Sequence, residues 1–194
     1  MSKNLFFGLG LFTLIGFSLI GALIIKYGIG TSFGSVFQHG IAWYFQILIG
    51  LVYGFVGAWL GWKIIKSKLL IQTREFYRNI LKDLELNIHE IIFISFCAGV
   101  GEEILFRGAI QYYLGIWLTA IIFVAIHGYL NPKNWKLSIY GAFMTVVIAG
   151  MGWMFEEIGL LSAISAHFAI DAYLLKKLTE TKEENNNSLP FGKD

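Results

Sequence analysis

The sequence is poor in charged residues and contains a single cysteine. Asp, Glu, Lys and Arg make up 14% of the 194 residues, hydrophobic residues make up 56%, and the mean hydropathy is +0.64. Soluble domains carry about 25% charged residues, so this composition excludes that class and predicts an integral membrane protein. The single cysteine, Cys97, excludes a disulfide framework and a thiolate metal cluster. Its position in a hydrophobic stretch predicts a packing role.

The common catalytic and nucleotide-binding motifs are also missing. The sequence has no His-Glu-x-x-His, no Gly-x-Ser-x-Gly, no Walker loop and no dinucleotide fingerprint. Function must therefore be inferred from polar residues in unusual places.

Six hydrophobic stretches predict an all-α, polytopic membrane bundle of about six transmembrane helices, at ~20 residues per span. They cover residues 5–26, 41–62, 89–114, 116–130, 136–154 and 158–175. The first is too long for a signal-peptide core and is predicted to remain as an uncleaved span. The fourth is short and is separated from the third only by Gly115. A tilted or partly re-entrant segment is therefore an alternative to a full span there.

The basic residues predict the orientation, because Lys and Arg near span ends are retained in the cytoplasm. With six spans, the basic residues that follow lie on one side: Lys3, the segment 63–82, Lys133, Lys136 and the tail from Lys176. Both termini are thus predicted to be cytoplasmic, in a bacterial plasma membrane.

Residues 1–175 are predicted to form one transmembrane domain. Within it, residues 66–88 alternate basic and apolar side chains at helical spacing, which predicts an amphipathic helix on the inner leaflet. This helix is either a connector that fixes topology or an element that gates or delivers substrate. Residues 176–194 form a polar tail that is predicted to be disordered. Four glycines in the second stretch predict a close helix contact within the chain: Gly50, Gly54, Gly57 and Gly61.

Ionisable residues within three hydrophobic stretches predict a functional site, because charge at membrane depth is costly. Glu102 and Glu103 follow an apolar run, and Arg107 lies four residues after Glu103. The two other polar groups follow later in the sequence: His127, four residues after Phe123, and the pair His167 and Asp171. Three polar clusters on three hydrophobic segments predict one buried site.

Helical spacing separates the roles of the two glutamates. Glu103 and Arg107, at i and i+4, should form an ion pair. Glu102 then points about 100 degrees away and is free to act as a general base. With His127 and the pair on the last stretch, it could hold a water molecule against a peptide carbonyl. The alternatives are an ion pair that only fixes helix register and a His127 that only packs.

Other polar residues are interpreted as structural. Glu156 and Glu157 precede Gly159 and are predicted to lie in a solvated turn. His39 and His89 stand at predicted span ends, where interfacial roles are sufficient.

Taken together, the motifs Glu-Glu-x-x-x-Arg at 102–107, Phe-x-x-x-His at 123–127 and His-x-x-x-Asp at 167–171 resemble a known family. It is the CPBP family of intramembrane endopeptidases, the CAAX protease and bacteriocin-processing group, also called Abi. The resemblance covers residues 89–175. It implies a membrane-embedded protease.

Residue by residue, the resemblance implies that Glu102 and His127 activate a water molecule. His167 and Asp171 would orient it or stabilise the oxyanion, and the supporting residues would be Glu103, Arg107 and Phe123. Asp171 stands where the eukaryotic prenyl-protein proteases of the family have Asn. An ionised Asp accepts hydrogen bonds but cannot donate one, so this position differs from the Asn in what it can offer to an oxyanion.

The cofactor is open between two alternatives. Glu102, His127, His167 and Asp171 could bind zinc, whose catalytic sites use three protein ligands and a water. The resemblance favours a metal-free reaction that depends on the glutamate.

The expected partners are membrane lipids and a peptide or lipidated protein, such as a prenylated tail or a bacteriocin leader, and no nucleic acid. The sequence does not predict the oligomeric state. Competing hypotheses are a non-catalytic bacteriocin immunity or scaffold protein of the same fold and a small ion or proton carrier.

Overall fold

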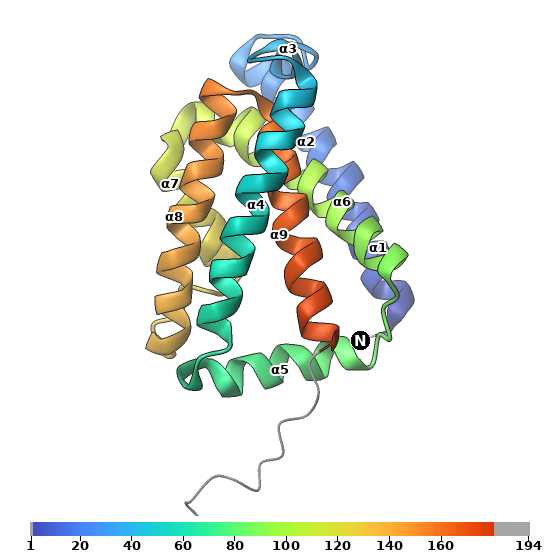
Figure 1. Cartoon of the computed structure of the whole chain (residues 1–194). Coiled ribbons are helices and arrows are strands. Elements are labelled where there is room, and N and C mark those ends of the chain that lie inside the picture. Colours follow the sequence, from blue (N-terminus) through green and yellow to red (C-terminus); the bar gives the residue numbers. More distant parts are fainter. Residues whose placement is uncertain (1, 181–194) are drawn as a thin grey trace, which may run out of the picture.

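The computed structural model describes residues 2–180, and all regular elements in that range are helices (Figure 1). The predicted all-α membrane bundle is confirmed. Helices of the bundle run between two ends. One end, here called the α5 end, carries the short helix α5 (Ile71–Lys82), which lies across the others. The opposite end holds residues 30–42 and the turn between the last two helices.

The first hydrophobic stretch forms one continuous helical rod, Lys3–Ile29. It consists of α1 (Lys3–Phe12), a π-helical segment (Thr13–Phe17), α2 (Ser18–Leu23) and a second π-helical segment (Ile24–Ile29). The rod ends at Gly30, whose φ of 81° is the left-handed conformation that terminates helices. The one-turn helix α3 (Ser35–Gln38) follows.

The second stretch is α4 (Trp43–Ile65), and a short 3-10 turn (Lys68–Leu70) leads from it into α5. The amphipathic helix predicted over residues 66–88 is thus shorter and ends before Glu85, which has a φ of 43°. The buried face of α5 also differs from that of a simple amphipathic helix, in which only apolar residues are buried. In α5, Arg74 and Arg78 are buried together with Leu81.

The third and fourth stretches are joined. α6 (Ile88–Leu105) begins with a capping box between Asn87 and Glu90, continues through a π-helical turn (Phe106–Ile110) and passes into α7 (Gln111–Ile126). Gly115 breaks α7 with a φ of 68°. Residues 116–126 then advance only about 16 Å at 1.5 Å per residue. That is roughly half of the about 30 Å hydrocarbon core, so this segment alone is too short for a straight crossing.

The last two stretches are α8 (Trp135–Glu157) and α9 (Leu160–Glu180). Residues 176–180 are therefore helical and do not belong to a disordered tail, and residues 181–194 lie outside the described residues. α9 runs through the middle of the bundle, beside α4 and α6 (Figure 1). Because α9 carries the pair His167 and Asp171, its central course brings that pair inside the bundle.

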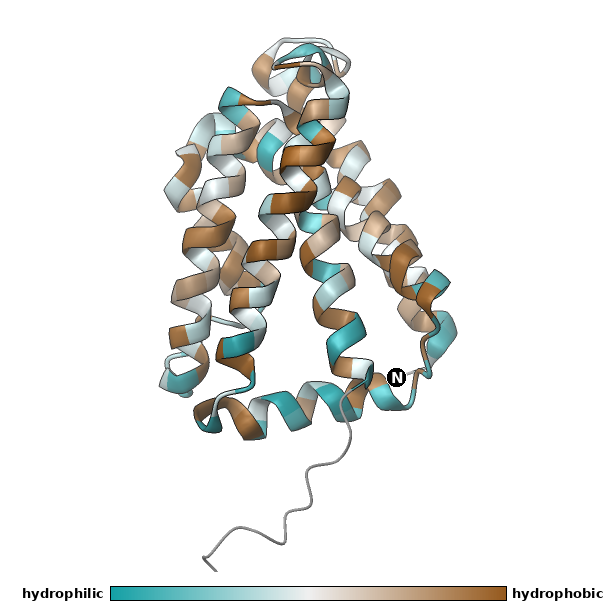
Figure 2. Cartoon of the chain, viewed as in Figure 1, coloured by the Kyte–Doolittle hydropathy of each residue, from teal (hydrophilic) through white to brown (hydrophobic). Residues whose placement is uncertain are grey.

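In the described part of the chain, four helices are long and apolar enough to cross a membrane: Lys3–Ile29, Trp43–Ile65, Ile88–Ile126 and Trp135–Glu157. The Ile88–Ile126 helix includes the break at Gly115, and the more polar α9 is not among the four. The number of six spans therefore stays a prediction. Large apolar side chains lie exposed along the rod and α4, and Figure 2 shows apolar residues on the outside of these helices, where lipid contacts them.

Glycines allow the helices around α9 to approach closely. A Cβ at Gly50 or Gly54 of α4 would overlap the backbone carbonyls of Ser162 or Ala166 of α9. On α6, a Cβ at Gly101 would overlap the carbonyl of Thr13. The predicted glycine contact within the chain is confirmed, and it seats α9 at the turn that precedes His167.

Candidate functional site

The structure brings the three predicted polar clusters together between α6, α7 and α9. Glu102 and Glu103 come from the end of α6, His127 caps the C-terminus of α7, and His167 and Asp171 come from α9. Residues that lie 64 positions apart, such as Glu103 and His167, are in direct contact. One site therefore draws on all three motifs.

Glu103 is the buried centre of this arrangement. Its side chain is 0% exposed, and its Oε1 accepts a hydrogen bond from Nη1 of Arg107 at 3.0 Å and another from Nδ1 of His167 at 2.7 Å. The i and i+4 ion pair predicted from spacing is present. Arg107 is 1% exposed and also donates from Nη2 to the carbonyl of Ile148 on α8 at 3.2 Å. The pair thus connects three helices and does not face the pocket described below.

His167 lies between two carboxylates. Its Nδ1 donates to Glu103, and its Nε2 lies 3.5 Å from Oδ2 of Asp171. Asp171 is partly exposed, with 32% of its side chain accessible. A buried carboxylate therefore fixes the imidazole from behind, and an accessible carboxylate stands in front of it.

Glu102 pairs with His127 and is separate from the ion pair of its neighbour. Oε2 of Glu102 lies 3.5 Å from Nε2 of His127, and their side chains are 13% and 33% exposed. Nδ1 of His127 donates to the carbonyl of Phe123 at 2.7 Å, one turn earlier on α7. In the neutral imidazole this bond leaves Nε2 unprotonated. The nitrogen that faces Glu102 is then able to accept a proton.

Phe123 packs between the two histidines. Its ring stacks on His127 with centroids 4.4 Å apart and an interplanar angle of 26°, and it meets His167 edge-on at 5.7 Å. The guanidinium carbon of Arg107 lies 5.0 Å from the centre of the same ring. The predicted supporting residue thus fixes the spacing between the two halves of the site.

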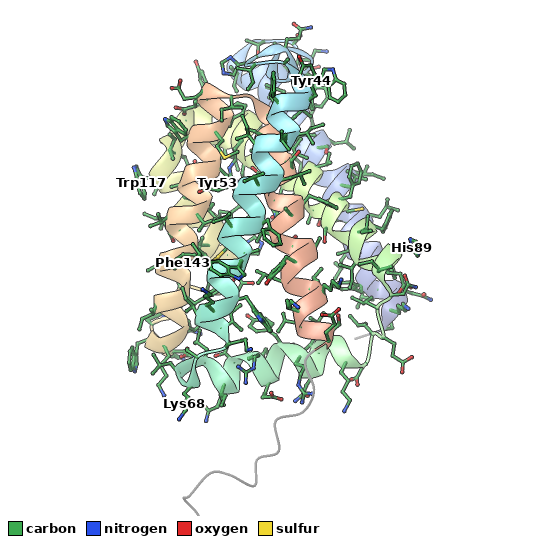
Figure 3. All side chains as sticks on the ribbon, viewed as in Figure 1. Tyr44, Tyr53, Lys68, His89, Trp117 and Phe143 are labelled. Atoms are coloured by element: carbon green, nitrogen blue, oxygen red, sulfur yellow. The ribbon has the colours of Figure 1, made fainter. Side chains whose placement is uncertain are left out.

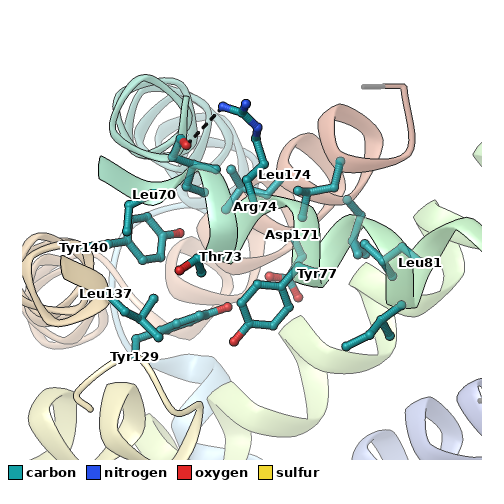
Figure 4. A pocket seen from close by; sticks show the side chains of 14 residues that line it. Leu70, Thr73, Arg74, Tyr77, Leu81, Tyr129, Leu137, Tyr140, Asp171 and Leu174 are labelled. Carbon is teal, nitrogen blue, oxygen red and sulfur yellow. Dashed lines mark hydrogen bonds between the residues drawn. The ribbon is translucent and has the colours of Figure 1, made fainter. Parts of the chain in front are cut away.

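A cavity of about 200 Å³ opens beside Asp171 at the α5 end (Figure 4). α5 contributes Thr73, Arg74 and Tyr77 to its wall, and the connection between α7 and α8 contributes Tyr129. Most of the remaining lining is aliphatic. The cavity is therefore an apolar space with tyrosine side chains and the carboxylate of Asp171 in its wall.

The arrangement of possible donors decides whether the site can hold a metal. Among residues 2–180, no three His, Cys, Asp or Glu side chains are arranged so that they could hold one ion. Nδ1 of each histidine already binds within the protein, His127 to a carbonyl and His167 to Glu103. The four possible zinc ligands named from sequence thus do not fit a metal in this arrangement of the described residues.

The structure adds contacts that the sequence interpretation missed. Gln111 continues the line of Glu103 and Arg107 by one more turn, is buried, and donates to the carbonyl of Gly152 at 3.0 Å and to Oε1 of Glu156 at 2.9 Å. Glu156 is therefore an exposed residue of the last turn of α8 with a buried partner, and not a residue of a solvated turn. The spacing of four residues was the available signal for Gln111.

The two remaining histidines are outside the site. His89 is exposed near the start of α6 and points away from the bundle (Figure 3). His39 contacts the carbonyl of Glu156 at the opposite end. Both are at helix ends or connections, as expected for interfacial residues. Cys97 is buried, which agrees with a packing role.

Comparisons with known proteins point to the same segment. Residues 85–173 match the family model described as type II CAAX prenyl endopeptidase Rce1-like. The chain is also 39% identical over 87 residues to the uncharacterized protein YpbD of Bacillus subtilis (strain 168). That match covers 44% of this chain and 44% of YpbD, so it spans less than half the length of the relative. No solved structure matches.

Proposed function

Because the chain belongs to the Rce1-like family of CAAX-type intramembrane proteases, the CPBP group, we propose that it hydrolyses a peptide bond of a membrane-associated substrate without a metal. The observation that carries this proposal is the pair Glu102 and His127 beside the pair His167 and Asp171. A base with an unprotonated partner nitrogen and a second polar pair nearby is what water activation requires.

The proposed reaction begins with a water molecule held between the two pairs. Glu102, with His127, takes a proton from this water, and the oxygen forms a bond to the carbonyl carbon of the peptide. The carbonyl electron pair moves to its oxygen. When the tetrahedral intermediate collapses, the C–N bond breaks and the amine receives the proton. Glu103 and Arg107 hold His167 in position and do not contact substrate.

The substrate segment is proposed to enter through the cavity at the α5 end. This cavity borders Asp171, and α5 forms one of its walls. That position favours a delivery role for α5 over that of a simple connector. A peptide or lipidated protein that lies along the membrane surface would reach the site from there.

The same end of the bundle is proposed to face the cytoplasm. Nζ of Lys3 lies 2.7 Å from Oε1 of Glu90, which joins the N-terminus to the start of α6. The basic residues of α5 and the end of α9 lie at this end as well (Figure 1). Retention of basic residues in the cytoplasm then gives both termini the same orientation in a bacterial plasma membrane.

The test is cleavage of a quenched peptide library, with lipidated and unmodified members, by purified protein in lipid nanodiscs. The wild type is compared with Glu102→Gln, and Glu157→Gln, an exposed acid at the opposite end of the bundle, is the matched control. We expect Glu102→Gln to lower the rate by about 100-fold or more, as for loss of a general base, and Glu157→Gln to have no effect. Equal cleavage by wild type and Glu102→Gln would reject the proposal. Cleavage by none of the three, across the whole library, would favour a non-catalytic immunity or scaffold protein.

A further inference from the structure

The proposed hydrolysis requires a hydrogen-bond donor for the oxyanion that forms on the peptide carbonyl. The two accessible carboxylates, Glu102 and Asp171, accept hydrogen bonds when ionised and cannot donate them. A tetrahedral intermediate beside two carboxylates would be repelled unless a donor reached it. The structure must therefore provide a donor from another residue.

The obvious cationic and imidazole groups are already engaged. Arg107 is buried and donates to Glu103 and to the carbonyl of Ile148. Both nitrogens of His167 face carboxylates. These contacts leave neither side chain a donor aimed at the cavity.

His127 is also committed. Its Nδ1 donates to the carbonyl of Phe123, and its Nε2 faces Glu102. In the proposed reaction Nε2 is needed for the proton of water. These three side chains therefore leave the oxyanion to a donor from another residue.

Tyr129 has the position and the chemistry of that donor. Its ring lies nearly parallel to His127, with an interplanar angle of 19° and centroids 6.1 Å apart. It lines the same cavity as Asp171, and in Figure 4 its hydroxyl points into that cavity. Within residues 2–180, the structure gives this hydroxyl no hydrogen-bond partner. An unused O–H group thus points into the space beside Asp171.

The hydroxyl of Tyr129 is a neutral donor. An unperturbed tyrosine titrates at about 10, well above the range in which carboxylates and histidines titrate. The neutral phenol is therefore present over the whole range in which a carboxylate and a histidine can activate water. It donates a hydrogen bond and keeps its proton throughout the reaction.

From these contacts we infer that the Tyr129 hydroxyl stabilises the oxyanion of the hydrolysis, in place of the donor that Asp171 cannot supply. This inference rests on the proposed function. The O–H group approaches the carbonyl oxygen as the water oxygen bonds to carbon and the electron pair moves to the carbonyl oxygen. The interaction weakens when the C–N bond breaks and the carbonyl is restored in the carboxylate product.

Two tyrosines outside the cavity provide matched controls. Tyr44 of α4 and Tyr112 of α7 are exposed, and neither lines the cavity beside Asp171. Tyr129, in contrast, lines that cavity and stacks on His127. Removing the hydroxyl of a control tyrosine deletes the same single atom at a distance from the site.

The experiment measures kcat and KM of wild type, Tyr129→Phe, Tyr44→Phe and Tyr112→Phe on one cleaved peptide, with Glu102→Gln as the inactive reference. Phe keeps the ring that stacks on His127, so folding should persist, and thermal unfolding checks this. We expect Tyr129→Phe to lower kcat by about 100-fold, as for loss of one oxyanion donor, with KM changed far less. The two control variants should remain within about threefold of wild type.

A second pair of variants tests the link to Asp171. In an Asp171→Asn background the amide can donate a hydrogen bond. The fold-decrease in kcat caused by Tyr129→Phe should therefore be at least about tenfold smaller there than in the wild-type background. A Tyr129→Phe variant with wild-type kcat, or the same loss in both backgrounds, would overturn the inference while leaving the protease proposal intact. A wild type that cleaves no faster than Glu102→Gln would remove both.

Discussion

Nδ1 of His167 donates to Oε1 of Glu103 across 2.7 Å, and this bond joins α9 to α6 inside the bundle. Glu103 is 0% exposed, so its charge depends on the partners that reach it. Arg107 supplies the opposite charge and His167 supplies a second hydrogen bond. The buried glutamate is thereby an anchor, whereas its neighbour Glu102 is 13% exposed and pairs with His127.

Glu103→Gln is expected to destabilise the fold more than Glu102→Gln. The neutral amide leaves Arg107 as a buried, uncompensated charge, and breaking a buried pair in this way costs about 3–5 kcal/mol. Chemical unfolding of both variants in the same detergent micelles measures the difference. Equal midpoints for the two variants would show that Glu103 is not the anchor.

Gly54→Ala is expected to disturb the site from a distance. The added Cβ would overlap the backbone carbonyl of Ala166, so α4 and α9 must move apart next to His167. Overpacking of this kind costs about 1–3 kcal/mol. Gly8→Ala is the control, because its Cβ would meet no atom within 4 Å. The unfolding temperature and the rate of peptide cleavage should both fall for Gly54→Ala and stay unchanged for Gly8→Ala. A Gly54→Ala variant with normal stability and activity would contradict the close contact.

Chelators are expected to leave cleavage unchanged. In the proposed reaction Glu102 activates water without a metal, and the described residues hold no group of three ligands that fits one. Activity is measured after dialysis against a strong zinc chelator, together with the zinc content of the protein. About one equivalent of zinc in active protein, with activity lost on its removal and restored on its return, would reject the metal-free mechanism.

Cysteine labelling is expected to place the two ends of the bundle on opposite sides of the membrane. Because Cys97 is the single cysteine and is buried, Cys97→Ala provides a clean background. Ser32→Cys, at the end opposite α5, should react with an impermeant maleimide from outside the cell. Lys68→Cys and Lys133→Cys, both exposed, should react only in inside-out vesicles. Labelling of all three from one side would contradict the proposed orientation.

Much of the site could be predicted from the sequence because its contacts are either local or carried by motifs. The ion pair of Glu103 and Arg107 follows from helical spacing alone. Composition and hydrophobic length gave the membrane bundle, and the glycines of α4 indicated a close contact within the chain.

The remaining features depend on tertiary contacts that no local pattern encodes. The bond between Glu103 and His167 joins positions 64 residues apart. The parallel stacking of Tyr129 on His127 requires the turn after α7, which the hydrophobic pattern does not define. The burial of Arg74 and Arg78 depends on how α5 packs across the bundle. The hydrophobic pattern placed a boundary at Gly115 and a short segment after it, whereas the left-handed φ of 68° at Gly115 is known only from the structure.

The short segment after Gly115 has a consequence for the supply of reactants. A protease in lipid needs two of them, and water is the one that the bilayer withholds. Because residues 116–126 advance only about half the thickness of the hydrocarbon core, the polar connection that follows, with Asn131, Lys133 and Asn134, starts at His127 itself. Hydration of this connection would bring solvent directly to the proposed base, so that a water consumed in each cleavage is replaced from the α5 end without crossing lipid.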